Sequence, residues 1–497
     1  MIGTVREYNH FIGGEWVPPG SGKFIERRNP ATWQLVSRFA DGTPEDAKRA
    51  ITVARQAFDS GPWPRMSGMD RARILFRLAD LIRNEKEQLA KMETEETGKP
   101  IKLSRGDMDG CIGLIEYAAG LAQQLHGECY SNLGERHTAL VIREPVGVVG
   151  MIVPWNFPAL IFCQKMPFAL AAGCTVVAKP SEFTSSSTLE ISRLALKAGV
   201  PAGVINIVTG YGAQVGQAIV DDPDVDFISF TGSTVTGKRV IASSADTLKK
   251  VSVELGGKSA NIVFADADLD DAIDGTMLGV FFNNGETCCA CSRLIIEDSI
   301  ADKFIEKLVE RTRQLKVGNP LNLDTDIGAL IHEKHADKVK GFIKTGQEQG
   351  AKLLAGGLKS LPDECQTECF VLPTIFDHVK TEMSIFQEEI FGPVLSITRF
   401  KTINEAIRIA NSTRYGLASA VWTKNIDKAM VVSREMKSGT VWVNTVIDGS
   451  AQLPFGGYKT SGFGREMGQA GFEEFTEVKT VNIHIGKREP FYNIDKN

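Results

Sequence analysis

The sequence lacks the segments that insert into a membrane or direct a chain to secretion. No stretch of about 20 uncharged apolar residues occurs in the 497-residue chain, so no membrane span is expected. Residues 1–10 contain neither an apolar core of secretory length nor a small-residue cleavage site. Nine cysteines, an odd number in so long a chain, do not suggest a disulfide framework and suit a reducing compartment. The sequence therefore predicts a cytoplasmic protein.

An excess of positive charge is also missing. The formal net charge is −5, which disfavours a nucleic-acid partner, because binding to a phosphate backbone requires a concentrated basic surface. Internal repeats and low-complexity tracts are not evident. The hydrophobic content of 43% and the charged content of 24% are ordinary for a globular protein, and the length predicts two or three domains.

Short apolar runs alternate with helix-length stretches between residues 146 and 265. The apolar runs are 146–153, 174–178, 204–208, 225–230 and 261–264, and the helical stretches lie near 184–199, 213–221 and 233–244. Strands that are apolar on both faces are typical of a parallel sheet. The alternation predicts an α/β fold with a doubly wound nucleotide-binding sheet.

Other parts of the chain have patterns of their own. A second α/β pattern, with helical stretches at 300–315, 336–350 and 403–412 and strands at 393–397 and 439–443, predicts a second, catalytic domain. The segment 44–125 is mainly helical. Residues 477–485 largely alternate polar and apolar side chains, which indicates a strand whose open edge a partner subunit could cover.

A cysteine and a glutamate supply the groups for covalent catalysis. Cys288 lies in the segment FFNNGETCCA, and Glu254, 34 residues earlier, lies in VELGGK. A thiolate attacks carbonyl carbons, and a carboxylate moves protons. An isolated cysteine is most often a small buried hydrophobe, but a helix starting near this loop would lower the pKa of the thiol. Glu254, between two apolar neighbours, is expected to be partly buried rather than on the surface, which raises its pKa.

Metal-binding patterns are incomplete. Cys289 and Cys291 follow Cys288, but no matching cysteine or histidine pair stands near them in the sequence. The segment HEKH at 332–335 is one residue short of the HExxH zinc motif and is expected to be solvated helix surface. We therefore expect no metal.

Polar residues follow three of the expected strands. Asn156, in PWNFP, can donate an amide N–H to an oxyanion or cap a turn. Lys179 and Glu182 suit the ribose hydroxyls of a dinucleotide, or form a solvated charge pair. The Glu182 carboxylate would repel a 2′-phosphate, which favours NAD over NADP. Ser233, in FTGSTVTG, would cap a helix that either faces a pyrophosphate or is a plain helix start.

These segments resemble the active-site signatures of the NAD(P)-dependent aldehyde dehydrogenase superfamily. The resemblance extends along nearly the whole chain, from NPAT at 29–32 to PFGGYKTSG at 454–462. The segment EEIFGPV at 388–394 resembles the family motif that positions the nicotinamide half of the cofactor. The resemblance implies that an aldehyde is oxidised to a carboxylic acid with NAD through a cysteine thiohemiacetal and thioester.

The resemblance also implies roles for individual residues. Cys288 would be the nucleophile, Asn156 and the Cys288 N–H would form the oxyanion hole, and Glu254 would activate the hydrolytic water. Cofactor contacts are implied for Ile152, Pro154, Trp155, Lys179, Ser181, Glu182, Gly212, Phe230, Gly232, Ser233, Leu255, Glu389 and Phe391. Walls of the substrate pocket are implied for Phe157, Gln164, Thr287, Cys289 and Phe455.

The sequence departs from relatives at several positions. Gln469 stands where many relatives have a second glutamate thought to relay protons, so any relay must differ. Gln164 replaces a frequent tryptophan, and residues 445–450 include no aromatic, which disfavours a quaternary-ammonium substrate. Glu286 replaces the commoner glutamine of the cysteine loop. Together with Thr287 and Phe455, Gln164 suggests a partly polar aldehyde.

Two alternative functions remain. A CoA-acylating relative would use CoA in place of water, but the well-known acylating relatives lack the base at Glu254. A non-catalytic structural or binding protein with the same fold would have no need of Cys288, Glu254, Asn156 and Lys179.

The resemblance implies three parts and a homodimer or homotetramer. The parts are an NAD-binding domain at 1–125 and 145–255, a catalytic domain at 256–460, and a small β oligomerisation element at 126–144 and 470–490.

Overall fold

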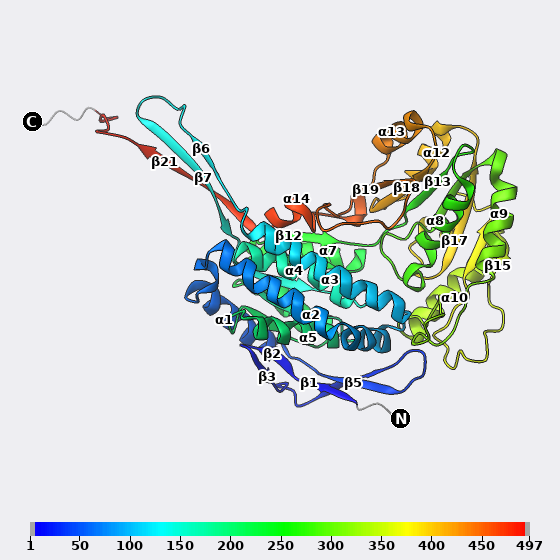
Figure 1. Cartoon of the computed structure of the whole chain (residues 1–497), viewed down its shortest axis with the longest axis horizontal. Helices are drawn as coiled ribbons and strands as arrows, with labels where there is room; N and C mark the ends of the chain where they lie inside the picture. The colour runs from blue at the N-terminus through cyan, green and yellow to red at the C-terminus, as the bar shows by residue number, and fades with distance from the viewer. Residues whose placement is uncertain (1–4, 493–497) are drawn as a thin grey trace, which may run out of the picture.

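Two large sheets form the centres of two lobes, and a narrow β arm extends from one of them (Figure 1). The structure is a computed structural model, and it describes residues 5–492. The first lobe is built on an eight-stranded sheet and the second on a seven-stranded sheet. Both sheets are mainly parallel and carry helices, which confirms the predicted α/β class.

The first sheet has five parallel strands at its centre. In spatial order its strands are β20 (Gly462–Phe463), β12 (Lys250–Glu254), β11 (Phe227–Thr231), β8 (Val148–Ile152), β9 (Thr175–Lys179), β10 (Ile205–Ile207), β2 (His10–Ile12) and β3 (Glu15–Val17). The chain runs outward from β8 through β9 and β10 and returns on the other side of β8 as β11 and β12. This reversal creates the crevice at which doubly wound sheets bind ligands.

One strand prediction is wrong. The run 261–264 does not belong to the first sheet, because β13 (Ala260–Val263) lies in the second sheet. The fifth parallel strand of the first sheet is β12 instead, and β20 from the C-terminal region pairs with it. β12 alternates charged or polar residues with valines, so its sequence carries a weaker apolar signal than its neighbours.

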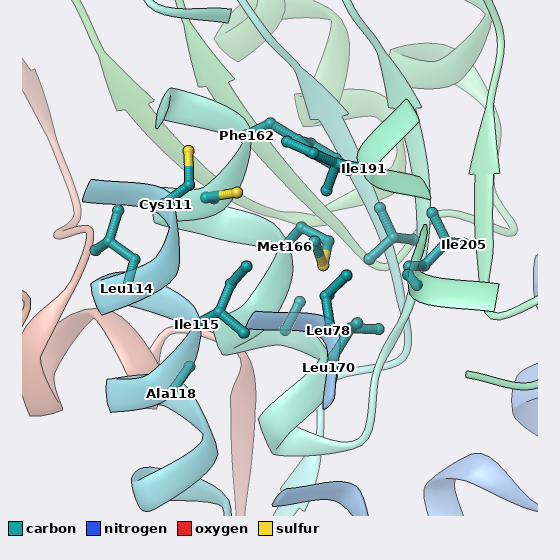
Figure 2. Packing of buried hydrophobic residues seen from close by; sticks show 14 of the residues in the cluster. Leu78, Cys111, Leu114, Ile115, Ala118, Phe162, Met166, Leu170, Ile191 and Ile205 are labelled. Atoms are coloured by element: carbon teal, nitrogen blue, oxygen red, sulfur yellow. The ribbon is translucent and has the colours of Figure 1, made fainter. Parts of the chain in front are cut away.

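Helices cover both faces of the first sheet. One face packs against α2 (Gly68–Thr97), α3 (Ile101–Ala122), α4 (Pro158–Ala172) and α5 (Ser186–Ala198), and the other against α1 (Pro44–Asp59), α6 (Gln217–Asp221) and α7 (Thr234–Ser244). Consecutive residues of β8 belong to different cores: Val149 faces the α4 side and Val148 the α1 side. Figure 2 shows side chains of α2, α3, α4 and α5, together with Ile205 of β10, in the first of these cores.

The second lobe repeats the α/β construction. Its sheet runs in the order β15 (Lys352–Ala355), β16 (Thr374–Asp377), β17 (Val394–Phe400), β14 (Arg293–Glu297), β13, β18 (Ala418–Trp422) and β19 (Thr440–Val443). Its helices are α8 (Leu269–Phe281), α9 (Asp298–Thr312), α10 (Glu333–Glu348), α11 (Ser384–Gln387), α12 (Ile403–Ala410) and α13 (Ile426–Glu435). The predicted stretches 300–315, 336–350 and 403–412 correspond to α9, α10 and α12.

The β arm joins segments that are far apart in the sequence. Its strands are β21 (Thr476–His484), β7 (His137–Pro145) and β6 (Glu128–Tyr130), with β21 at one edge and α14 (Gly468–Glu473) at its base. The predicted strand at 477–485 is therefore confirmed. β21 lies at the edge of the arm (Figure 1). Its Val478, Val481 and Ile483 are exposed, so the arm presents apolar side chains beside an open strand edge.

A small sheet near the N-terminus completes the fold. It contains β1 (Arg6–Tyr8), β5 (Leu35–Ala40) and β4 (Phe24–Arg28). Among the helices of residues 5–492, none is long and apolar enough to cross a membrane.

Candidate active site

The loop that carries Cys288 has an unusual backbone. After α8, three consecutive residues adopt left-handed φ angles: Asn283 at 52°, Asn284 at 60° and Gly285 at 75°. Asparagine and glycine tolerate this region better than other residues. A Cβ atom on Gly285 would lie 2.2 Å from the carbonyl carbon of Gly392. The Asn-Asn-Gly sequence therefore allows the chain to reverse against the segment before β17.

Cys288 is half-buried in this loop, and its thiol is not activated by a helix. No helix begins between Gly285 and β14, so the expectation of an electropositive helix end is wrong. The contact with the neighbouring Cys289 thiol, together with burial, raises the pKa of the Cys288 thiol well above its usual range. The backbone N–H of Cys289 lowers the pKa of the thiol but does not offset these effects, so the Cys288 thiol keeps its proton at neutral pH unless a base removes it.

Glu254 is a buried carboxyl group close to Cys288. It is the last residue of β12, it is buried, and neither carboxylate oxygen has a hydrogen-bond partner among residues 5–492. Burial, followed by the charge of Glu466, raises the pKa of Glu254 well above its usual range, and the Cys288 thiol contributes to the same shift. The predicted burial and raised pKa of Glu254 are confirmed.

Two glycines after Glu254 bring three functional segments together. A Cβ atom on Gly257 would lie 2.3 Å from the carbonyl oxygen of Cys288, and one on Gly256 would lie 2.1 Å from a carboxylate oxygen of Glu389. The Gly257 N–H donates to Glu389 Oε1 over 3.0 Å. Only residues without side chains permit this approach, so the Gly-Gly sequence brings together Glu254, the Cys288 loop and the Glu389 carboxylate of the EEIFGPV segment.

A second buried carboxylate, missed in the sequence, lies beside Glu254. Glu466 pairs with the fully buried Lys165 of α4 and accepts a hydrogen bond from Thr231 over 3.3 Å. Gln469 is exposed and donates to Glu473, away from this cluster. The carboxylate beside Glu254 is therefore that of Glu466, which agrees with the expectation that any relay must differ from one through position 469. No local pattern marks it, since Lys165 is 301 residues away.

Asn156 reaches the loop that carries Cys288. It is buried and its Nδ2 donates to the backbone oxygen of Glu286 over 2.9 Å, while Asn283 donates to the Asn156 carbonyl over 3.1 Å. A side-chain amide has two N–H groups, so one remains for a further acceptor. The side chain of Asn156 is thus fixed two residues from Cys288.

The walls near this site are mainly aromatic. Phe157 stacks on Phe282 with ring centroids 6.0 Å apart, and Phe455 packs against the cores of both lobes. Thr287 is buried and donates to the Phe282 carbonyl over 3.2 Å. Gln164 is partly exposed on α4, whereas Cys289 is buried in the core of the second lobe.

Polar groups gather at the carboxyl ends of β9 and β10. Lys179 ends β9 with a buried ammonium that donates to the Gly210 carbonyl over 3.0 Å and lies 3.4 Å from a carboxylate oxygen of Glu182. Burial lowers the pKa of Lys179. Ser181 is buried between them, and Gly212 is exposed at the start of a helical turn. This pair fits ribose hydroxyls, because a hydroxyl can accept a hydrogen bond from the Lys179 ammonium and donate one to the Glu182 carboxylate.

The helix after β11 is capped as expected. Ser233 precedes α7 and its hydroxyl accepts from the Thr236 N–H over 3.2 Å. A Cβ atom on Gly232 would lie 2.6 Å from the ring of Phe230, and one on Gly237 would lie 2.4 Å from Leu255. Glycines thus bring the start of α7 close to β11 and β12, and the helix N-terminus suits a phosphate group.

An aromatic cluster faces the end of β8. Ile152 and Pro154 lie at the end of this strand, followed by Trp155, whose ring is perpendicular to that of Phe391 at 5.3 Å. His335 packs on Trp155 at 5.4 Å, and its Nε2 lies 2.7 Å from the Phe391 carbonyl. The expectation that HEKH is solvated surface is wrong for His335, because this residue faces inward from α10.

Glu389 completes the set of carboxylates. Burial raises the pKa of Glu389 to about 7, and the Gly257 N–H partly offsets this effect. Together with the polar groups of β9 and the start of α7, these residues fit a dinucleotide that extends along the carboxyl ends of the first sheet. Among residues 5–492, no group of three or more histidine, cysteine or acidic side chains is placed to hold a metal ion.

Comparison with known proteins decides the family. The sequence model of the aldehyde dehydrogenase family matches residues 16–481. The chain belongs to the aldehyde dehydrogenase family. It is 45% identical to a betaine aldehyde dehydrogenase of Bacillus subtilis over 471 residues, which cover 95% of this chain and 96% of that protein. It is 43% identical to human mitochondrial aldehyde dehydrogenase, covering 96% of this chain and 92% of that protein.

Solved structures of this family have the same fold. An NAD-dependent aldehyde dehydrogenase from Sinorhizobium meliloti superposes with a TM-score of 0.96 at 45% identity, covering 98% of this chain and 96% of that chain. Betaine aldehyde dehydrogenase from Staphylococcus aureus, crystallised with NAD+, superposes with a TM-score of 0.95 at 38% identity, covering 98% and 96%. These relatives confirm the predicted enzyme class, an NAD-dependent aldehyde dehydrogenase, and NAD as the predicted cofactor.

Proposed function

We propose that the protein is a hydrolytic aldehyde dehydrogenase in which Cys288 is the nucleophile, Glu254 the base and Asn156 an oxyanion donor. The observation that carries this proposal is the contact between the two motifs at Gly257, whose Cα lies against the Cys288 carbonyl. The contact holds the Glu254 carboxyl group beside the Cys288 thiol, and the pKa of each group is raised. A weak acid next to a weak base exchanges a proton readily, because neither ionised form is strongly favoured.

The first half of the reaction forms a thioester. Glu254 takes the proton of the Cys288 thiol, and the sulfur attacks the aldehyde carbon. The free N–H of Asn156 and the backbone N–H of Cys288 stabilise the oxygen that becomes negative. When bound, NAD+ supplies the acceptor for the hydride that leaves the carbon. Loss of that hydride leaves an acyl group on Cys288.

The second half hydrolyses the thioester. Glu254 first releases to solvent the proton that it took from Cys288, and then removes a proton from water, which attacks the acyl carbon. The Cys288 thiolate is displaced and takes this second proton back from Glu254 as the carboxylic acid leaves. Glu466 and Lys165 form a buried ion pair, and the charge of Glu466 acts on Glu254 directly. We infer that this pair tunes the proton affinity of Glu254.

NAD is preferred over NADP because of Glu182. Lys179 and Glu182 would hold the adenosine ribose, and a 2′-phosphate would bring two negative groups together. Glu389 would accept hydrogen bonds from the nicotinamide ribose, with Phe391 and Trp155 beside the ring. The remaining cofactor contacts are those of Ile152, Pro154, Ser181, Gly212, Phe230, Gly232, Ser233 and Leu255.

The substrate is a neutral, partly polar aldehyde. Phe157 and Phe455 would supply apolar walls, and Gln164 and Thr287 polar groups. Betaine aldehyde is the substrate named for the Bacillus subtilis relative. A trimethylammonium group would find fewer aromatic faces here, because residues 445–450 are not aromatic.

The protein acts as a cytoplasmic homo-oligomer, a dimer or a tetramer. The exposed apolar residues and the open edge of β21 support pairing between subunits. The cofactor domain would comprise 1–125 and 145–255, the catalytic domain 256–460, and the oligomerisation element 126–144 and 470–490. Residues 462–463 lie outside these three ranges. They form β20, which pairs with β12 and completes the cofactor sheet.

An assay with a panel of aldehydes tests the proposal. Purified protein receives NAD+ and either neutral aldehydes or betaine aldehyde, with and without CoA. Acid production without CoA, fastest for neutral aldehydes, is expected. Strict dependence on CoA would instead identify an acylating enzyme, and absence of NADH formation with every aldehyde would reject catalysis.

A further inference from the structure

A buried glutamate that the proposed reaction does not use connects the Cys288 loop to the start of α10. Glu286 is 2% exposed, and its Oε1 accepts from the Ile331 N–H over 2.9 Å. Arg27 donates to the Ile331 carbonyl over 2.9 Å, so hydrogen bonds hold both sides of this residue. A buried carboxyl group needs such a partner, because its transfer out of water is costly. The side chain of Glu286 therefore anchors the loop to the segment that precedes α10.

The backbone of the same residue holds Asn156. The Glu286 carbonyl accepts from Asn156 Nδ2 over 2.9 Å and from Asn283 Nδ2 over 3.1 Å. Asn283 Nδ2 also donates to the Asn156 carbonyl over 3.1 Å. A side-chain amide is planar, so the acceptor of one N–H fixes the direction of the other. The position of the Glu286 peptide thus determines where the remaining N–H of Asn156 points.

A second anchor holds the loop but lies farther from Cys288. Asn284 donates to the Ala329 carbonyl over 3.0 Å and accepts from the Gly328 N–H over 2.8 Å. Loss of the Glu286 side chain would leave these two hydrogen bonds intact. The loop would then stay attached, whereas the peptide at Glu286 would be free to shift.

The aromatic wall of the cofactor site, formed by Trp155, His335 and Phe391, does not depend on Glu286. His335 Nε2 lies 2.7 Å from the Phe391 carbonyl, and a carbonyl can only accept, so Nε2 carries the hydrogen. Glu286 Oε1 lies 3.7 Å from the same nitrogen, which is too long for a hydrogen bond. The rings of Trp155 and Phe391 pack on His335 at 5.4 and 6.0 Å. These contacts hold the wall together without the glutamate.

We propose that Glu286 is a positioning residue, which anchors its own peptide so that Asn156 faces the oxygen of a bound aldehyde. This inference rests on the proposed function, in which Asn156 stabilises the intermediate formed on Cys288. The reach of the side chain to the Ile331 N–H is what matters, and not its negative charge. Displacing a reacting group by about 1 Å costs about 100-fold in rate. Loss of the anchor should therefore slow thioester formation by about that factor and leave NAD+ binding unchanged.

Three substitutions of Glu286 separate reach from charge. Glu286→Gln keeps the length of the side chain and an oxygen that can accept from the Ile331 N–H, but it removes the charge. Glu286→Asp keeps the carboxylate, yet the side chain is one methylene shorter and cannot reach this N–H unless the loop moves. Glu286→Ala removes both. Glu286→Gln should retain most of the rate, whereas Glu286→Asp and Glu286→Ala should lose it.

Each substitution is introduced into Glu254→Gln, because the NADH burst of this variant reports thioester formation without hydrolysis. After rapid mixing with NAD+ and an aldehyde, the burst rate constant should fall about 100-fold with Glu286→Ala and Glu286→Asp. The burst amplitude should remain about one NADH per subunit, and a fluorescence titration should give an unchanged NAD+ dissociation constant. A residue that only stabilises the fold would lower the amplitude and the melting temperature, but not the rate constant.

Glu333→Ala is the matched control, because it removes an exposed carboxylate from the first residue of α10. It should leave the burst rate unchanged. An unchanged rate with Glu286→Ala, or a rate with Glu286→Gln as low as with Glu286→Ala, would overturn the proposal. Should Glu286→Ala fail to fold, a slow Glu286→Gln beside a fast Glu286→Asp would overturn it equally. Absence of any burst in Glu254→Gln itself is a different result, which would reject the proposed function and with it this inference.

Discussion

Replacing Glu254 by glutamine separates the two halves of the proposed reaction. The carboxylate is buried without a hydrogen-bond partner, so the isosteric amide fits the same space and breaks no contact within the described chain. Thioester formation requires the base only to deprotonate Cys288, whereas hydrolysis requires it to activate water. General bases typically contribute about 10²–10⁴-fold. We therefore expect steady-state turnover of Glu254→Gln to fall by about that factor.

Rapid mixing of the variant with NAD+ and an aldehyde, followed by NADH absorbance, provides the assay. A burst of about one NADH per Cys288 is expected before the slow phase, because hydride transfer precedes hydrolysis. The burst should accelerate as pH rises, since the pKa of Cys288 is raised and its thiolate must form without the carboxylate. Glu333→Gln, on the exposed start of α10, is the matched control and should turn over normally. Normal turnover in Glu254→Gln would refute the assignment of the base.

Stability gives a second test of the same residue. The folded-state pKa of Glu254 lies above its unfolded value of about 4.3, so between these values the folded chain keeps a proton that the unfolded chain has lost. Stability from this group is complete below the unfolded pKa and is lost as pH rises through the folded pKa. Glu254→Gln should therefore melt at a higher temperature than the native protein at alkaline pH, with the gap closing towards pH 4. A constant gap across this range would contradict the raised pKa.

Four further changes have distinct expected outcomes. Cys288→Ala should abolish aldehyde oxidation while NAD+ still binds in a fluorescence titration, whereas Cys291→Ala should be far milder; near-normal oxidation in the first variant would exclude the covalent mechanism. Glu182→Ser should narrow the NAD over NADP preference in kcat/KM by about tenfold, roughly 1.4 kcal/mol, and a native preference for NADP would reject this assignment. Gly257→Ala should displace the Cys288 loop and lower kcat/KM by about 100-fold, with circular dichroism checking that the fold persists. Removal of residues 477–497 should weaken assembly in light scattering, and an unchanged oligomer would place the interface elsewhere.

The repeated local patterns of this chain could be predicted from sequence. The parallel strands β8, β9, β10 and β11 lie in mainly apolar runs. The start of α7 could be predicted because a serine, Ser233, stands where its hydroxyl caps the helix. The motif residues Cys288 and Glu254 lie in short segments that are specific enough to identify together. These features depend on neighbours within a few residues, which is the range that periodicity and motif spacing report.

Features that depend on distant partners could not be predicted. The strand β12 is recognisable only beside β11 and β20, and β20 comes from more than 200 residues later. Glu466 meets Lys165 and Glu254 only in space, and His335 meets Trp155 only because α10 turns it inward. The thiol environment of Cys288 was misjudged for a related reason: left-handed residues reverse the chain, where a new helix had been expected.

Mass spectrometry of the trapped acyl-enzyme tests the central claim most directly. Glu254→Gln is mixed with NAD+ and an aldehyde, quenched in acid within the burst, and digested. The covalent mechanism predicts an acyl group on the peptide that contains Cys288, located by fragmentation to that sulfur and present in about one copy per subunit. An acyl group on Cys289 or Cys291 instead, or NADH formation in the burst without any acylated cysteine, would contradict it.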